Sequence, residues 1–289
     1  MGCKILLPLK GEGRHNRRMS FHSTAVIHEA TRIDPSVTIG PYAVIEDGVE
    51  LGAGCVIEAH AMVRSGSVLG EGCHVFPHAV VGGPPQDLRF DPKTPSGVRL
   101  GNRVTVREGV TIHRATQAGQ FTWVEDEAFL MAYSHVAHDC RIGPHAILAN
   151  NVMMGGFVEI GAHAFIGGGA ALHQFIRIGE SVMVSGVSRL TRDVPPFCLV
   201  AERDELSGFN LIGLKRRGFG SEVIRELKKL YRAVYFDGGN PKHYAEAARN
   251  DHMAQTPEGT RFLEFFAGGK RGFVRPERRL HATEDDTDV

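Results

Sequence analysis

The sequence predicts a parallel β-helix built from six-residue repeats, followed by a smaller α-helical domain. The first observation is a period, because an aliphatic residue returns at every sixth position from Ile27 to Val81. The second is the make-up of each repeat: glycine often follows the aliphatic residue, and a small residue often stands four places after it. The third is a change after residue 197, where apolar residues recur at the three- and four-residue spacing of amphipathic helices.

A period of six suits neither a helix of about 3.6 residues per turn nor a long strand with a period of two. It suits a short strand and a tight turn. Three such units close a triangular coil of roughly 18 residues, and such coils stack about 4.8 Å apart. The aliphatic and small positions then fill the interior, and glycine relieves the corner. Cys55, Cys73 and Cys140 occupy the small position, so we expect them to be inert interior residues.

The repeat is interrupted twice, and inserted loops are expected near 83–99 and 115–122. It ends at DVPPF (193–197), so we assign residues 22–195 to the β-helix and 196–275 to the helical domain. The other expected segments are helices at 225–236, 243–254 and 259–269, a disordered extension at 1–21, and a disordered acidic tail at 276–289.

The composition excludes several classes of protein. The 33 basic and 33 acidic residues balance, which argues against a nucleic-acid partner or an anionic membrane surface. No apolar run approaches the roughly 20 residues of a membrane span, and the N-terminus lacks the pattern of a signal peptide. The five cysteines are odd in number and include no CxxC pair, which indicates a reducing compartment. We therefore expect a soluble cytoplasmic protein without an integral membrane segment.

The segment YSHVAHDCRIG (133–143) contains His135, His138 and Asp139. Three interpretations are open. The histidines belong to an ordinary polar surface; or His135 and His138 bind a metal with a third histidine from another subunit; or His138 is a general base supported by Asp139. The repeat alone does not separate the metal site from the base.

Counting by the 18-residue coil aligns His138, Gly156 and Gln174 on three successive coils, with His173 beside Gln174. This position is the third of the hexad and lies outside the interior. We therefore expect these side chains to face outward near a corner.

Longer motifs carry a specific resemblance. The segments "GGPPQDLRF", "VTIHRAT", "LMAYSHVAHDC", "ALHQF" and "NLIGLKRRGF" occur in this order. Over roughly residues 22–270 the chain resembles the UDP-N-acetylglucosamine O-acyltransferases that open lipid A synthesis. That family moves a 3-hydroxyacyl chain from acyl carrier protein to the sugar 3-hydroxyl of UDP-N-acetylglucosamine and requires no metal. Hexapeptide acyltransferases form a left-handed parallel β-helix, so the resemblance implies that hand, against the usual right-handed preference.

The resemblance implies roles by position. His138 would be the general base, Asp139 would support it, and the backbone N–H of Gly156 would hold the oxyanion. The implied substrate-binding residues are Gln86, Asp87, Arg89, His135, His173, Gln174, Met183, Gly186, Asn210, Arg216 and Arg217. Among these, the residues of the first loop would reach the sugar and diphosphate from a neighbouring chain.

Further expectations concern chain length, docking and assembly. The small Gly186 at the end of the acyl groove leaves room for a chain of roughly C12–C14 rather than C10, since each buried methylene adds about 0.8 kcal/mol. The basic cluster around Arg216 and Arg217 suits phosphate and the acidic acyl carrier protein. The family is trimeric, and outward-facing groups on a β-helix form a cleft only with a neighbour, so a homotrimer is expected.

Three positions depart from the family: Arg89 stands where lysine is usual, Phe157 replaces a histidine, and Ile212 replaces an acidic residue of some members. The resemblance leaves open whether the acceptor carries a 3-hydroxyl or a 3-amino group. The alternatives are another hexapeptide acyltransferase with a different acceptor or an acetyl-CoA donor, a zinc-dependent hydratase of the β-helical carbonic anhydrase type that uses His135 and His138, and a non-catalytic scaffold.

Overall fold

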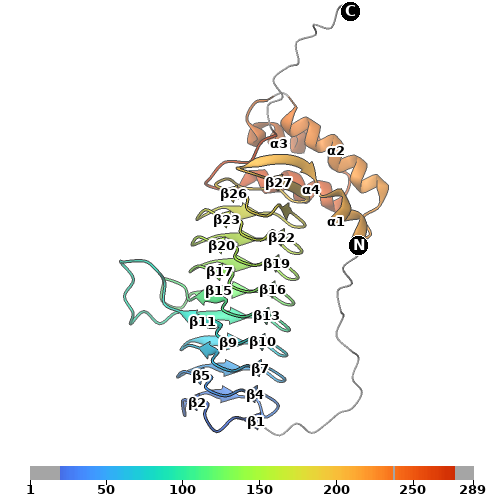
Figure 1. The fold of residues 1–289 in the computed structure, drawn as a ribbon. Coiled ribbons are helices and arrows are strands. Elements are labelled where there is room, and N and C mark those ends of the chain that lie inside the picture. Colours follow the sequence, from blue (N-terminus) through green and yellow to red (C-terminus); the bar gives the residue numbers. More distant parts are fainter. Residues whose placement is uncertain (1–19, 237, 277–289) are drawn as a thin grey trace, which may run out of the picture.

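The computed structural model describes residues 20–236 and 238–276, and the extension and the tail expected at the two ends lie almost entirely outside this range. Each six-residue repeat becomes a short strand followed by a turn, and the strands stack into the three sides of a column (Figure 1). Val56 aligns with His74 and Ile57 with Val75, one 18-residue coil later. The fold is the left-handed parallel β-helix predicted from the sequence.

The described residues form three sheets, which we number in the order in which the chain enters them. Sheet 1 contains β1 (Ser20–Phe21), β4 (Thr38–Ile39), β7 (Val56–Ile57), β10 (His74–Val75), β13 (Thr105–Val106), β16 (Phe129–Leu130), β19 (Ile147–Leu148), β22 (Phe165–Ile166), β25 (Met183–Val184), β27 (Cys198–Ala201) and β28 (Glu205–Phe209). Sheet 2 contains β2 (Val26–Ile27), β5 (Val44–Ile45), β8 (Met62–Val63), β11 (Val80–Gly83), β14 (Thr111–His113), β17 (His135–Val136), β20 (Met153–Met154), β23 (Ala171–Leu172) and β26 (Arg189–Leu190). Sheet 3 contains β3 (Arg32–Ile33), β6 (Glu50–Leu51), β9 (Ser67–Leu69), β12 (Gly97–Leu100), β15 (Phe121–Val124), β18 (Arg141–Ile142), β21 (Glu159–Ile160) and β24 (Arg177–Ile178).

The interior of the column is filled as the repeat predicts. The aliphatic positions are buried from Ile39 onward, and the small positions between them are buried as well. Cys55, Cys73 and Cys140 lie in this interior, and Cys198 is also buried. Burial raises the pKa of the Cys140 thiol to about 12, so it stays protonated and unreactive at neutral pH.

Both inserted loops leave the column at the same edge, between sheets 2 and 3. The first runs from Gly83 at the end of β11 to Gly97 at the start of β12, and the second runs from His113 of β14 to Phe121 of β15. The last residues of each predicted loop already belong to the next strand. Likewise β1 begins at Ser20, inside the stretch expected to be disordered, because it pairs with β4.

The helical part covers one end of the column (Figure 1). Its elements are α1 (Leu211–Arg216), α2 (Ser221–Tyr235), α3 (Pro241–Asn250), α4 (Pro257–Glu264) and the 3-10 turn η1 (Phe265–Ala267). The side chains of Asn210, Asn240 and Thr256 cap α1, α3 and α4. The antiparallel pair β27–β28 and the short α1 were not predicted from the sequence. No helix among the described residues is long and apolar enough to cross a membrane.

Candidate active site

The candidate site lies on the edge of the column between sheets 2 and 3, which we call the His138 edge. His138 and Asp139 form the turn between β17 and β18, and Gly156 occupies the matching turn one coil later. Asp139 adopts a left-handed φ of 60°, as the turn requires of the fourth hexad position. The predicted outward position of His138 is therefore observed, although its side chain is only 16% exposed.

Asp139 holds the imidazole of His138. The Nδ1 of His138 lies 2.8 Å from Oδ2 of Asp139. Thr116, in the second loop, donates its hydroxyl to the same carboxylate at 2.8 Å and its backbone N–H at 3.1 Å. Thr122 accepts the backbone N–H of Asp139 at 2.8 Å. Thr116 and His138 thus fix the carboxylate of Asp139, Thr122 fixes its backbone, and the Nε2 of His138 is left for another partner.

The charge state of Asp139 suits this arrangement. Burial raises the pKa of the Asp139 carboxyl, but hydrogen bonds from His138 and Thr116 outweigh that effect and hold the pKa below its usual range. The carboxylate therefore stays ionised near neutral pH. An ionised partner at Nδ1 selects the tautomer whose Nε2 accepts a proton.

Gly156 lies directly beneath the ring of His138. A Cβ at this position would come 2.5 Å from Cε1 and 2.8 Å from Nε2 of His138, so only glycine fits without displacing the imidazole. The N–H of Gly156 has no protein acceptor among the described residues, whereas the next N–H, that of Phe157, is taken by the carbonyl of His138. A free backbone donor therefore stands one coil from the free imidazole nitrogen.

Two further histidines adjoin His138 on the sheet 2 side. The Nδ1 of His135 forms a hydrogen bond of 2.7 Å with Oγ1 of Thr111. The ring of His135 also packs edge-on against that of His113, with ring centroids 4.7 Å apart. Burial, with the neighbouring His135 and His138, lowers the pKa of His113 to about 4. Burial and then His138 lower the pKa of His135 as well. Both rings are therefore neutral at pH 7.

Aromatic rings line the same edge beyond Gly156. The ring of Phe157 meets His138 edge-on at 5.4 Å and stacks on Phe175 at 4.8 Å. Phe157 thus packs against the imidazole of His138. Thr116, Thr122 and His113 were missed by the sequence analysis. Thr116 lies in the second loop and Thr122 in the strand that follows it, where the count of six is broken. His113 carries no signal beyond its place in "VTIHRAT".

The first loop reaches the His138 edge of its own chain. Arg89 donates to Asp87 through Nη2 at 3.2 Å, and hydrogen bonds from Arg89 lower the pKa of the Asp87 carboxyl, with a smaller contribution from the charge of His138. Asp87 is therefore within electrostatic range of His138 in one chain. The expectation that Gln86, Asp87 and Arg89 serve a neighbouring chain stays a prediction.

A second group of implied binding residues lies elsewhere. Asn210 donates to the carbonyl of Ser181 at 3.0 Å, and Arg217 donates to the Ser181 hydroxyl. Ser181 sits at the turn between β24 and β25, on the edge between sheets 3 and 1, which we call the Ser181 edge. Arg216 ends α1 nearby and is exposed. A single chain does not bring these residues to His138.

Two more of the implied substrate-binding residues, of which Gly186 was assigned to the acyl groove, lie on other sides of the column as well. Met183 begins β25 on the outer face of sheet 1, and Gly186 is exposed at the edge between sheets 1 and 2. By contrast, His173 and Gln174 follow β23 on the His138 edge. The predicted acyl-chain length stays a prediction.

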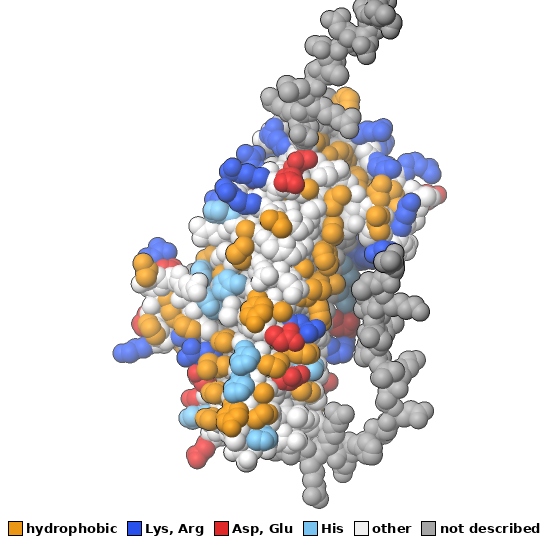
Figure 2. Space-filling view, viewed as in Figure 1, with side chains coloured by type: hydrophobic (Ala, Val, Ile, Leu, Met, Phe, Trp, Pro, Cys, Tyr) orange, Lys and Arg blue, Asp and Glu red, His pale blue; other side chains and the backbone are white. Residues whose placement is uncertain are grey.

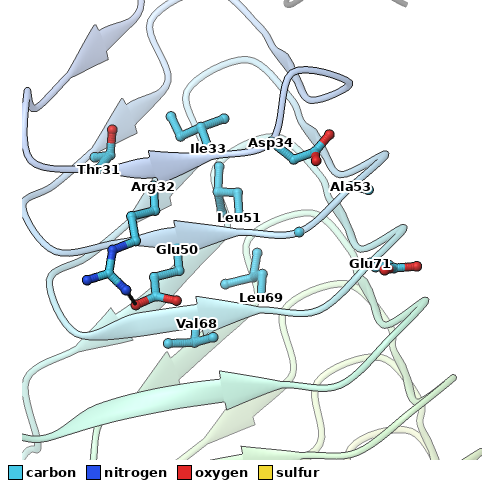
Figure 3. A pocket seen from close by; sticks show the side chains of 11 residues that line it. Thr31, Arg32, Ile33, Asp34, Glu50, Leu51, Ala53, Val68, Leu69 and Glu71 are labelled. Carbon is cyan, nitrogen blue, oxygen red and sulfur yellow. Dashed lines mark hydrogen bonds and ion pairs between the residues drawn. The ribbon is translucent and has the colours of Figure 1, made fainter.

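Two observations within one chain bear on alternative sites. No group of three His, Cys, Asp or Glu side chains there converges as a metal site would require. A surface hollow on sheet 3 lies in the first coils, where its lining includes Arg32 and Glu50 (Figure 3). These two already pair with each other at 3.0 Å, and the hollow contains none of the histidines.

A repeated coil with an imidazole–carboxylate pair over a free amide defines a hexapeptide acyltransferase. The bacterial transferase hexapeptide family (six repeats) matches residues 24–65 and 121–156. Domain 2 of the UDP N-acetylglucosamine O-acyltransferases matches residues 193–274.

Whole-chain relatives narrow the class. An acyl-[acyl-carrier-protein]–UDP-N-acetylglucosamine O-acyltransferase of Thermodesulfovibrio yellowstonii is 43% identical over 257 residues, 88% of this chain and 99% of the relative. One from Paraburkholderia phytofirmans is 43% identical over 261 residues, 88% and 99% of the two chains. The UDP-N-acetylglucosamine acyltransferase of Francisella novicida superposes with a TM-score of 0.84 at 30% identity, covering 92% of this chain and 100% of that one. The UDP-N-acetylglucosamine acyltransferase of Campylobacter jejuni superposes with a TM-score of 0.82 at 34% identity, and the match covers 89% of this chain and 99% of that one. The chain belongs to the UDP-N-acetylglucosamine O-acyltransferase family.

Proposed function

We propose that this enzyme transfers a 3-hydroxyacyl chain from the thioester of acyl carrier protein to the 3-hydroxyl of UDP-N-acetylglucosamine, the first step of lipid A biosynthesis, and that His138 is its general base. The observation that carries the proposal is the pair formed by His138 and Asp139 above the bare Gly156. A base needs one imidazole with a fixed tautomer, and an acyl transfer needs a donor for the oxyanion beside it.

The reaction follows from this geometry. The Nε2 of His138 takes the proton of the sugar hydroxyl as its oxygen attacks the thioester carbonyl. The N–H of Gly156 donates to the oxyanion of the tetrahedral intermediate, while Asp139 balances the imidazolium charge. When the carbon–sulfur bond breaks, His138 returns its proton to the leaving thiolate, so that the enzyme regains its starting protonation state.

We propose that the enzyme works as a homotrimer whose site lies between chains. The support is the separation of Arg216 and Arg217 on the Ser181 edge from His138 on its own edge. A cyclic assembly turns one edge of each chain toward a different edge of the next. Basic groups of one chain then face the imidazole of its neighbour and suit the diphosphate and the acidic carrier protein.

One assay tests the reaction. Purified protein is incubated with UDP-N-acetylglucosamine and a ladder of 3-hydroxyacyl carrier proteins, and the product is weighed by mass spectrometry. We expect an O-acylated nucleotide sugar, with chains of roughly C12–C14 preferred because each buried methylene favours binding by about 0.8 kcal/mol. A parallel incubation with the 3-amino analogue of the acceptor identifies which group is acylated.

The variant His138→Ala tests the base. Loss of a positioned base costs typically about 10²–10⁴-fold in rate. We expect at least that fall in kcat, with binding of acyl carrier protein and nucleotide retained. Unchanged turnover in a folded His138→Ala enzyme would contradict the assignment and favour a different catalytic group.

A further inference from the structure

The segment that follows η1 lies against the His138 edge and carries two cations there. The Nζ of Lys270 lies 5.8 Å from the centroid of the Phe175 ring. The Nη2 of Arg271 lies 2.8 Å from Nδ1 of His173. Phe175 and His173 belong to the coil directly beyond that of Gly156. Lys and Arg side chains gather over this helical end of the molecule (Figure 2).

A buried ion pair fixes the backbone of this segment. Asp193 is fully buried and accepts from Nε of Arg177 at 2.9 Å. Arg177 in turn donates to the carbonyl of Phe265 at 3.0 Å. The backbone N–H of Asp193 donates to the carbonyl of Gly272 at 2.8 Å, and its carbonyl accepts from Val274 at 3.0 Å. These hydrogen bonds therefore fix the backbone of the loop that places Lys270 and Arg271 at the His138 edge.

Gly269 shows how closely this loop is fitted. It has a left-handed φ of 94°, and an added Cβ would collide with the carboxylate of Asp193. A side chain at this position is excluded both by the backbone conformation and by the space. The close fit of Gly269 beside Asp193 positions the loop so that Lys270 and Arg271 lie on the edge that carries His138.

The two cations form no ion pair among the described residues, although the positive charge of Arg271 counters part of the rise in pKa that burial causes at Asp193. Within the part of the chain that the structure describes, neither Lys270 nor Arg271 has a carboxylate within the 4.0 Å of an ion pair. Arg271 contacts the ring of His173 instead, whose Nδ1 also lies 3.1 Å from the carbonyl oxygen of Gln174. An ammonium and a guanidinium on consecutive residues thus lie beside neighbouring side chains of one coil, where an oxyanion could accept hydrogen bonds from both.

We propose that Lys270 and Arg271, beside His173, bind a phosphate group of a substrate while it reacts at His138; this deepens the proposed function and rests on it. Two coils separate this place from His138, about 10 Å at the spacing of stacked strands. Two phosphates are candidates: the diphosphate of the nucleotide sugar and the phosphate of the donor's pantetheine arm. Only the sugar ring separates the diphosphate from the reacting hydroxyl. The whole pantetheine arm separates the phosphate of the donor from the thioester.

Steady-state kinetics with Arg271→Gln and Lys270→Gln test the site. A hydrogen bond to a charged group contributes enough that its loss raises a dissociation constant about tenfold or more. We expect KM to rise by that factor for one substrate, with kcat changed less than about threefold, as for uniform binding. Arg271→Lys keeps the charge without the planar fork and should fall between wild type and Arg271→Gln. The matched control is Lys229→Gln, an exposed cation of α2.

Direct binding identifies the source of the phosphate. Calorimetric titration of the wild type and variants uses UDP and 4′-phosphopantetheine as separate probes. Weaker binding of UDP alone assigns the diphosphate, and weaker binding of phosphopantetheine alone assigns the donor arm. Unchanged KM and unchanged affinity for both probes, in variants with the wild-type melting temperature, overturn the inference. A wild type that binds UDP but transfers no acyl group would count against the proposed function and leave the anion site to be judged by the titrations.

Discussion

Two edges of the column share one backbone and differ in what they carry. At the His138 edge, the third and fourth hexad positions hold His138, Asp139 and Gly156, and both inserted loops emerge there. At the Ser181 edge, the same positions hold the stacked rings of His145 and His163, with centroids 4.6 Å apart. The turns have the same left-handed φ, about 57–60° at Asp139 and His145. The backbone therefore provides equivalent turns at both edges, and the identity of the side chains decides which edge can carry a catalytic site.

The difference also lies in which charges are already matched. On the Ser181 edge, Glu180 accepts from Arg217 at 3.4 Å and from Arg261 at 3.0 Å. On the His138 edge, the imidazole has a fixed carboxylate behind it and a second nitrogen free to accept a proton in front. The charges of the Ser181 edge are thus paired with residues of the helical domain, whereas the His138 edge keeps an imidazole nitrogen available for a substrate. The following changes break or sharpen that contrast.

The largest effect is expected from Gly156→Ala. The added methyl would come 2.5 Å from Cε1 of His138 and would push the ring out of register with the amide. Alanine keeps the backbone N–H, so the loss comes from the displaced base, whose positioning contributes typically about 10²–10⁴-fold in rate. We expect kcat to fall by about 10²-fold or more, measured with the preferred 3-hydroxyacyl donor. The melting temperature should change little, because Gly156 is not among the glycines with a left-handed φ.

Gly168→Ala is the matched control. Gly168 holds the same hexad position on the edge between sheets 1 and 2, and its added Cβ would meet only Asn150 and Ala149, at 3.3 Å and 4.0 Å. We expect near wild-type turnover from this variant. Equal losses at Gly156 and Gly168 would mean that the coil, and not the His138 edge, is being damaged.

Mixing chains tests whether the two edges meet between subunits. His138→Ala chains are unfolded and refolded together with chains that carry both Arg216→Ala and Arg217→Ala, each inactive alone. If His138 of one chain works with the arginines of the next, about a quarter of the sites in random cyclic assemblies combine both intact halves. We expect that fraction of wild-type activity, measured against the refolded single variants.

A second mixture makes this test selective. Asp87 lies within electrostatic range of His138 in the same chain, so chains with Asp87→Ala should not rescue His138→Ala. Recovery with the loop variant and none with the arginine variant would reverse the assignment of the edges. Molecular mass by light scattering accompanies both mixtures and reports the expected trimer.

The sequence predicts more of the His138 edge than of its surroundings, for a physical reason. A strict period converts sequence distance into spatial position, so counting by 18 along the chain is enough to align His138 with Gly156. The count fails wherever the chain leaves the column. Thr116 belongs to an inserted loop, and Arg271 returns from a helical domain that no period connects to the edge.

The helical part shows the same limit. The helix α1 is six residues long and reads LIGLKR, too short to display a period. Its stability comes from the Asn210 cap and from packing of Leu214, which is fully buried. Its contact with Ser181 joins residues 29 positions apart or more. The local sequence pattern does not predict which edge of the column this helix covers. That placement determines where Arg216 and Arg217 lie.

The smallest effect concerns stability and contrasts the buried imidazole of His113 with the exposed ones. Burial, and then the nearby His135 and His138, lower the pKa of His113 from 6.5 to about 4. The folded protein therefore binds fewer protons than the unfolded chain between these values, so stability falls as the pH drops through that window. The loss amounts to about 2 kcal/mol at pH 5 relative to pH 7.

The variant His113→Leu cannot bind that proton, and its urea midpoint should change less than that of the wild type between pH 7 and pH 5. His78→Asn alters an exposed histidine in a turn with φ 61°, and it should keep the wild-type dependence. Equal pH dependence in all three proteins would mean that His113 is solvated in the folded state, and the cluster of neutral rings beside His138 would then lose its physical basis.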